Sequence, residues 1–71
     1  MPIVQLTPIT LHGRELLDLL ESRTGVPPFI ETSGAKAYRM AEPAKLDRFE
    51  GMLYRIERDW PMHLSLKLLS E

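Results

Sequence analysis

The chain has no cysteine, which excludes disulfide bonds, thiolate metal ligands and thiol chemistry. It also lacks an apolar run near the roughly 20 residues that cross a bilayer, and it does not begin with the basic and apolar segments of a secretory signal. An excess of one charge is missing too: nine Lys and Arg are balanced by ten Asp and Glu, so no overall positive field attracts nucleic acid. These absences predict a cytoplasmic protein with no membrane association.

Catalytic and metal-binding motifs are equally scarce. The sequence contains no phosphate-binding loop, no Gly-x-Ser-x-Gly elbow, no His-Glu-x-x-His and no calcium loop. His12 and His63 are the two imidazoles, and neither has a partner at metal-ligand spacing. His63 and Ser65 would share a strand face, without an acidic residue placed to orient the histidine. We therefore predict no catalytic residue, no metal and no cofactor.

The residues that are present have the balance of a small globular domain, with 44% hydrophobic and 27% charged side chains. Residues 1–71 are expected to form a single domain. A chain of this length buries only about 60% of the surface that its unfolded form exposes. A partner or a second copy that covers an apolar patch would add to its stability, and a homodimer is one such expectation.

Local patterns predict six short elements. They are a strand at 2–6, a helix at 11–23, strands at 29–32 and 35–40, a helix at 43–60 and a strand at 63–69. Thr10 can cap the first helix, and Gly25 supplies the left-handed residue past its end. Four leucines share one side of this helix: Leu16, Leu17, Leu19 and Leu20. The first helix is therefore amphipathic, with a buried leucine face.

The second helix carries the longest apolar stripe, and the two flanks of that stripe differ in charge. The stripe consists of Leu46, Phe49, Leu53, Ile56 and Trp60. Arg48 and Arg55 border it on the side of Met52. Glu50 and Glu57 border it on the other side. One flank of this helix is thus basic and the other acidic.

The last strand alternates between apolar and polar side chains. Leu64, Leu66 and Leu68 share one face, while the residues between them are polar. This pattern predicts a half-buried strand. At the edge of a sheet, its backbone could pair with another chain.

The segment 25–40 predicts a β-hairpin. Pro27 and Pro28 end the first helix and favour an extended chain, and Ser33-Gly34 indicates a two-residue turn. The resulting register places Glu31 opposite Lys36, Phe29 opposite Tyr38, and Ile30 opposite Ala37. A charge pair and an aromatic pair on one face both favour this register. Ser-Gly is a weaker turn signal than Asn-Gly, so a bulged loop that shifts the register by one residue is the alternative.

The element order is strand, helix, strand, strand, helix, strand, which indicates an α+β fold. Two amphipathic helices packed on one face of a mostly antiparallel sheet of three to four strands would bury all the apolar faces together. The expected architecture is a small two-layer sandwich, and the element order is compatible with a ferredoxin-like arrangement.

Residues 19–46, LLESRTGVPPFIETSGAKAYRMAEPAKL, contain a helix end, a turn with prolines, a hairpin with a glycine turn and a polar helix start. This succession resembles small winged DNA-binding proteins of the phage excisionase type. The resemblance implies that the first helix enters the major groove while Lys36 and Arg39 contact the DNA backbone or minor groove. Glu15, Asp18 and Glu21 on the exposed side of that helix make DNA the alternative partner and not the preferred one.

The first six residues, MPIVQL, resemble the start of small tautomerases that begin Met-Pro, lose the methionine and use the free proline nitrogen as a general base. That resemblance implies an enzyme in which Pro2 is the catalytic group. It ranks third among the functions, because a proline here also suits the start of an edge strand.

The preferred function is that of a non-enzymatic regulatory or inhibitory protein, of the kind that phages and mobile elements encode, acting by contact with another protein. Two surfaces are candidates for this contact. One is the flank of the second helix with Arg48, Met52 and Arg55, because methionine and arginine are favoured at interfaces. The other is the aromatic face of the hairpin with Phe29 and Tyr38.

Overall fold

The computed structural model describes residues 3–70, and its elements follow the predicted order. They are β1 (Ile3–Pro8), α1 (Leu11–Thr24), β2 (Ile30–Glu31), β3 (Lys36–Arg39), α2 (Pro43–Asp59) and β4 (Leu64–Ser70). The first strand extends two residues beyond the predicted end because Thr7 and Pro8 continue its pairing with β4.

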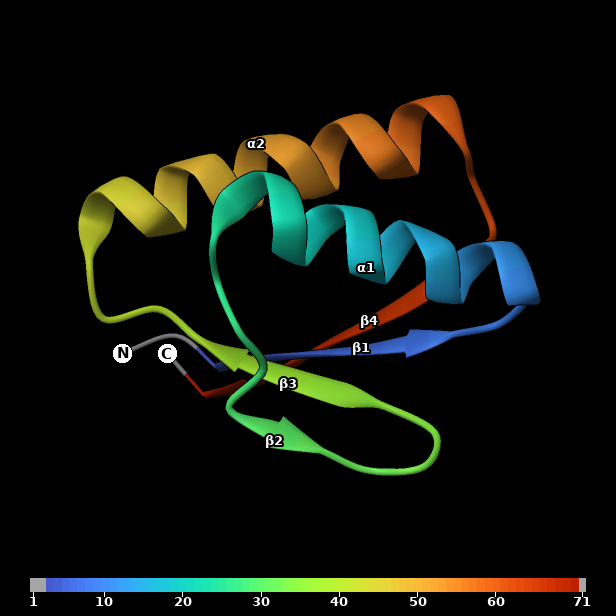
Figure 1. The fold of residues 1–71 in the computed structure, drawn as a ribbon, viewed down its shortest axis with the longest axis horizontal. Helices are drawn as coiled ribbons and strands as arrows, with labels where there is room; N and C mark the ends of the chain where they lie inside the picture. Colours follow the sequence, from blue (N-terminus) through green and yellow to red (C-terminus); the bar gives the residue numbers. More distant parts are fainter. Residues whose placement is uncertain (1–2, 71) are drawn as a thin grey trace.

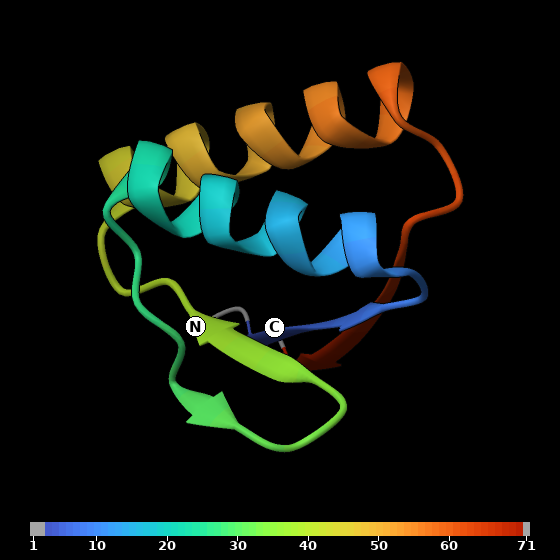
Figure 2. The ribbon, with the colours of Figure 1, turned by 45° about the vertical axis from the view of Figure 1, so that its right-hand side comes forward.

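The four strands form one antiparallel sheet in the order β2-β3-β1-β4. Figures 1 and 2 show α1 and α2 side by side on the same face of this sheet. Each helix connects two strands that have a third strand between them, which is the ferredoxin-like split βαβ arrangement. The predicted α+β two-layer fold is confirmed.

Both ends of α1 have the predicted caps. The Thr10 hydroxyl accepts a hydrogen bond from the Gly13 N–H at 3.0 Å, which satisfies one of the free donors of the first turn. Gly25 follows the helix with φ 73°, and its N–H donates to the Glu21 carbonyl at 2.8 Å. These caps place the buried leucines of α1 over the sheet.

The core fills the space between the helix layer and the sheet. Its centre is the pair of Tyr38 from β3 and Phe49 from α2, whose ring centroids are 5.1 Å apart. Other fully buried side chains around this pair are Leu6, Leu17, Leu20 and Ile56. Apolar residues from β1, β3 and both helices therefore meet in one cluster.

Three side chains predicted to lie on buried faces are only half-buried. Trp60 follows α2 as its C-cap residue and is 43% exposed, so the buried stripe of α2 ends at Ile56. Leu66 and Leu68 point to the helix side of the sheet but are 47% and 50% exposed. The physical reason is position: β4 is an edge strand, and α2 packs against α1 more than over β4. The prediction of burial is wrong at these positions.

The hairpin forms with two of its three predicted pairs, Ile30 with Ala37 and Glu31 with Lys36. The third pair, Phe29 with Tyr38, is not formed. The Phe29 N–H donates to the Ala37 carbonyl at 2.7 Å, and the Phe29 ring lies 4.4 Å from the guanidinium of Arg39. Tyr38 points the other way, into the core, so the two aromatic rings do not share a face.

Candidate protein-contact surfaces

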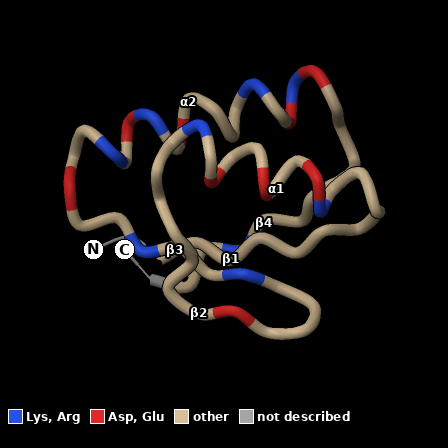
Figure 3. The backbone as a smooth tube through the Cα atoms, viewed as in Figure 1, with Lys and Arg blue, Asp and Glu red and all other residues tan. Residues whose placement is uncertain are grey.

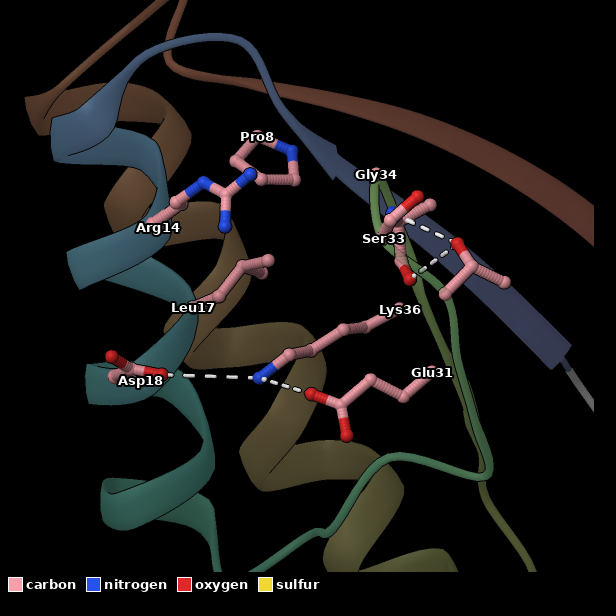
Figure 4. A pocket seen from close by; sticks show the side chains of 10 residues that line it. Pro8, Arg14, Leu17, Asp18, Glu31, Ser33, Gly34 and Lys36 are labelled. Carbon is pink, nitrogen blue, oxygen red and sulfur yellow. Dashed lines mark hydrogen bonds and ion pairs between the residues drawn. The ribbon is translucent and has the colours of Figure 1, made fainter.

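An ionic cluster joins the hairpin to α1. The Lys36 Nζ lies 3.0 Å from Glu21 Oε2 and 3.9 Å from Asp18 Oδ1, both on α1. It also lies 3.4 Å from Oε1 of Glu31, its neighbour across the hairpin. Figure 4 shows Lys36 extending between Asp18 and Glu31. The cation that the DNA alternative assigns to phosphate contacts is thus surrounded by carboxylates of its own chain.

Tyr38 belongs to the same cluster, and it is fully buried. Its hydroxyl donates to Glu21 Oε2 at 2.5 Å. Desolvation of the buried phenol, together with the hydrogen bond and charge of Glu21, raises the pKa of Tyr38 far above its ordinary value of 10.0. The hydrogen bond to Glu21 also raises the pKa of Lys36, against the opposing effect of burial. Tyr38 therefore stabilises the interior and is not on a surface that a partner could meet.

This cluster predicts that the protein loses stability in alkali. Above about pH 10 the unfolded chain releases protons that folded Tyr38 and Lys36 retain, so the free energy of unfolding falls as pH rises. Tyr38 contributes up to about 1.4 kcal/mol per pH unit to this decrease in the free energy of unfolding. Tyr38→Phe is expected to remove that contribution. Urea unfolding between about pH 9 and pH 11 measures the slope, with Tyr54→Phe at an exposed tyrosine as the control. An equal alkaline slope in Tyr38→Phe and the parent protein would contradict this assignment.

A pocket of about 220 Å³ opens between α1 and the turn of the hairpin. Figure 4 shows Arg14 and Leu17 lining it from α1, with Lys36 extending across it. The lining carries two cations, Arg14 and Lys36, and two carboxylates, Asp18 and Glu31. Both carboxylates already contact Lys36. The pocket therefore has no surplus charge with which to attract an ionic ligand.

Three of the predicted contact residues, Arg48, Met52 and Arg55, lie together in one shallow groove. We call it the basic groove; it is lined by Arg23, Thr24, Asp47, Arg48, Gly51, Met52 and Arg55. Arg48 and Arg55 are two turns apart on α2 with Met52 between them, so all three share one side of the helix. Arg23 joins them from the last turn of α1. Figure 3 shows the positions of Lys and Arg along the two helices.

The arginines of the basic groove have no ion pair within 4.0 Å among residues 3–70. This contrasts with Lys36, which has three carboxylate neighbours. Sequence reasoning did not group Arg23 with Arg48 and Arg55, because only the packing of α1 on α2 brings it there. The available signal was its place in the last turn of α1, directly before the capping region.

Exposed large hydrophobic residues gather around β4 more than at the hairpin. Phe29 and Ile30 belong to the hairpin; the others are Ile9, Leu11, Tyr54, Trp60, Met62, Leu66, Leu68 and Leu69. Met62, in the connection from α2 to β4, also has φ 71°, a strained conformation for a residue with a side chain. Hydrophobic periodicity does not predict the exposure of such turn residues. The sequence Trp60-Pro61-Met62, with two large apolar residues around a proline, was the available signal for an exposed apolar turn.

The remaining sequence-based candidates are placed as follows. Arg39 is exposed and stacks over Phe29, and Pro2 lies outside the described residues. Between Ile3 and Ser70, no three His, Asp or Glu side chains come together as metal ligands would. No helix in this part of the chain is long and apolar enough to cross a membrane.

The element order, strand directions and helix placement define the chain as a ferredoxin-like α+β domain. Comparisons of the chain with protein-family models, with curated proteins and with solved structures found no match.

Proposed function

We propose that this protein is a non-enzymatic regulator that binds an acidic, partly apolar segment of another protein in the basic groove. The observation that carries this proposal is that three arginines and Met52 line one groove, and that no carboxylate of residues 3–70 lies within 4.0 Å of the arginines, although Asp47 is also in the lining. A guanidinium offers paired donors that match a carboxylate, and a methionine side chain adapts to an irregular apolar surface. An Asp- or Glu-bearing segment with an adjacent apolar residue has the complementary chemistry.

The DNA alternative receives less support from the positions of its residues. Lys36 is engaged by carboxylates, and Arg39 stacks on Phe29. The exposed side of α1 also presents Glu15 and Asp18, which a phosphate backbone would repel. We therefore propose that the protein binds another protein in the cytoplasm. A chain without cysteine is compatible with that reducing compartment.

Two experiments test the proposal. A tagged protein is used to capture partners from cell lysate with and without nuclease, and capture of a protein partner is expected to survive the nuclease. Binding is then measured by fluorescence anisotropy with a labelled peptide of alternating Glu and Leu, compared with the same peptide carrying Gln in place of Glu. Arg48→Glu with Arg55→Glu is expected to weaken binding at least about tenfold for each arginine.

The matched control is Arg14→Glu with Arg39→Glu, which makes the same change in net charge at residues of α1 and β3 that do not line the basic groove. This control is expected to bind within about twofold of the parent protein, and added salt is expected to weaken binding to the Glu peptide alone. Loss of every partner after nuclease, or equal weakening by both double variants, would overturn the proposal.

A further inference from the structure

The outer edge of β4 is the longest unpaired strand edge in the described sheet. The opposite edge strand, β2, has two residues, whereas β4 runs over seven, from Leu64 to Ser70. A strand edge of this length presents a row of backbone N–H and C=O groups to whatever lies beside it. This edge is therefore the place in the described sheet where another strand could add.

The phase of the ladder shows which backbone groups of β4 point outward. The Ile9 N–H donates to the His63 carbonyl at 2.8 Å, so His63 directs its carbonyl toward the β1 side. Residues alternate along an antiparallel ladder, and Ser65 and Lys67 therefore share this orientation. The N–H and C=O groups of Leu64, Leu66 and Leu68 then point away from β1, to the outer edge.

The side chains of Leu66 and Leu68 form an uncovered apolar surface on the helix side of the sheet, beside Leu64, which packs partly against the core. Leu66 lies in a hollow between β4 and α2, whose lining includes Leu53 and Tyr54. Leu66 and Leu68 are about half exposed, and Tyr54 is exposed. The acidic flank of α2, with Glu50 and Glu57, forms the rim of the same hollow. The edge thus combines backbone groups that point outward with apolar side chains that are exposed to solvent.

We propose that a second copy of this chain covers this edge, with β4 pairing antiparallel to its own counterpart about a two-fold axis through Leu66. In this register Leu66 faces Leu66 of the other copy and Leu64 faces Leu68, so all three outward backbone positions are paired. On the opposite face Ser65 faces Lys67. A register centred on Lys67 would place two lysines directly opposite each other, and like charges in that position are unfavourable. The sequence LSLKLLS is therefore complementary to itself in the alignment centred on Leu66.

The pairing produces a continuous sheet of eight strands, because the four strands of each copy join at their β4 edges. The two-fold axis is perpendicular to the sheet, so all four helices lie on one face, and the basic grooves of the two copies open on that side. Glu50 and Glu57 of the two copies border the joined apolar surface. Salt screens the repulsion between them, so dimerisation is expected to persist at high salt, whereas the peptide binding proposed above weakens.

Analytical ultracentrifugation of the full chain tests the dimer, and hydrogen exchange measured by NMR tests its location. We expect a reversible dimer in which the amides of Leu64, Leu66 and Leu68 become protected as the concentration rises. The amides of Ser65 and Lys67, which face β1, are expected to stay protected throughout. Leu66→Lys, which places two lysines on the axis, is expected to raise the dimer Kd at least about tenfold. Leu11→Lys, at an exposed leucine outside the sheet, is the matched control.

Circular dichroism checks that Leu66→Lys is folded. Hydrogen exchange is measured on the unmodified protein, so it tests the location of the interface even if the variant does not fold. A protein that stays monomeric at concentrations up to about 0.5 mM, which corresponds to a free energy of association weaker than about -4.5 kcal/mol, would overturn the proposal. So would a dimer in which the amides of Leu64, Leu66 and Leu68 remain unprotected, or protection of these amides only when an extended peptide is added. None of these measurements uses the acidic peptide, so the proposed dimer and the proposed peptide binding in the basic groove are tested independently.

Discussion

Replacing Gly13 by alanine is expected to lower the free energy of unfolding by about 3 kcal/mol, the upper part of the usual range for overpacked sites. A Cβ atom at this position would lie 2.2 Å from the His63 carbonyl oxygen. That oxygen is held in place, because it accepts the Ile9 N–H at 2.8 Å and so ties the start of α1 to the start of β4. Relief of the clash would require the backbone of one connection to move. Urea unfolding followed by circular dichroism measures the loss.

The same substitution at Gly51 is the matched control. Gly51 is in the middle of α2, and nothing lies within 4 Å of an added Cβ atom there. Alanine favours the helix over glycine by about 0.8 to 1 kcal/mol, so Gly51→Ala is expected to stabilise the protein by roughly that amount. Destabilisation of similar size at Gly13 and Gly51 would show that helix packing in general, and not the contact with His63, limits these positions.

Replacing Phe49 by alanine is expected to cost about 4 kcal/mol, within the range measured for buried phenylalanines. Phe49 is 1% exposed, and its ring packs against Tyr38 across the boundary between α2 and the sheet. The substitution removes apolar contacts and leaves a cavity beside the phenol that donates to Glu21. Because domains of this size have free energies of unfolding of only about 5 kcal/mol, the variant would keep about 1 kcal/mol, and roughly a sixth of it is expected to be unfolded at room temperature.

Tyr54→Ala is the control for Phe49→Ala, because it removes an aromatic ring from the same helix at an exposed position. It is expected to change the free energy of unfolding by less than about 0.5 kcal/mol when measured on dilute, monomeric protein. Thermal unfolding followed by circular dichroism compares the two variants. Similar losses in both would mean that the centre of the core has been placed on the wrong side of α2.

Features set by neighbouring residues could be read directly from the sequence. The caps of α1 follow from Thr10 and Gly25, whose preferred conformations and hydrogen bonds are properties of a few successive residues. The hairpin register follows from the length of its turn. The grouping of Arg48, Met52 and Arg55 follows from helical periodicity alone.

Features that depend on distant segments could not be read in this way. The alternating pattern of the hairpin predicts that Tyr38 belongs to an exposed aromatic face. In the folded sheet its side chain points toward Glu21 and Phe49. Trp60 continues the apolar stripe of α2, but the helix ends before that position can be covered. Arg23 completes the basic groove only through the packing of α1 on α2.

The sequence by itself determined the α+β class, the order of the six elements and the amphipathic side of each helix, because periodicity and capping act within one element. The tertiary structure alone decided the strand order, and with it the position of β4 at an edge. The physical reason is that an alternating strand has the same pattern whether its apolar face is covered or open. Only the placement of α2 beside α1 leaves Leu66 and Leu68 half exposed, and thereby creates the surface on which a second copy is proposed to pair.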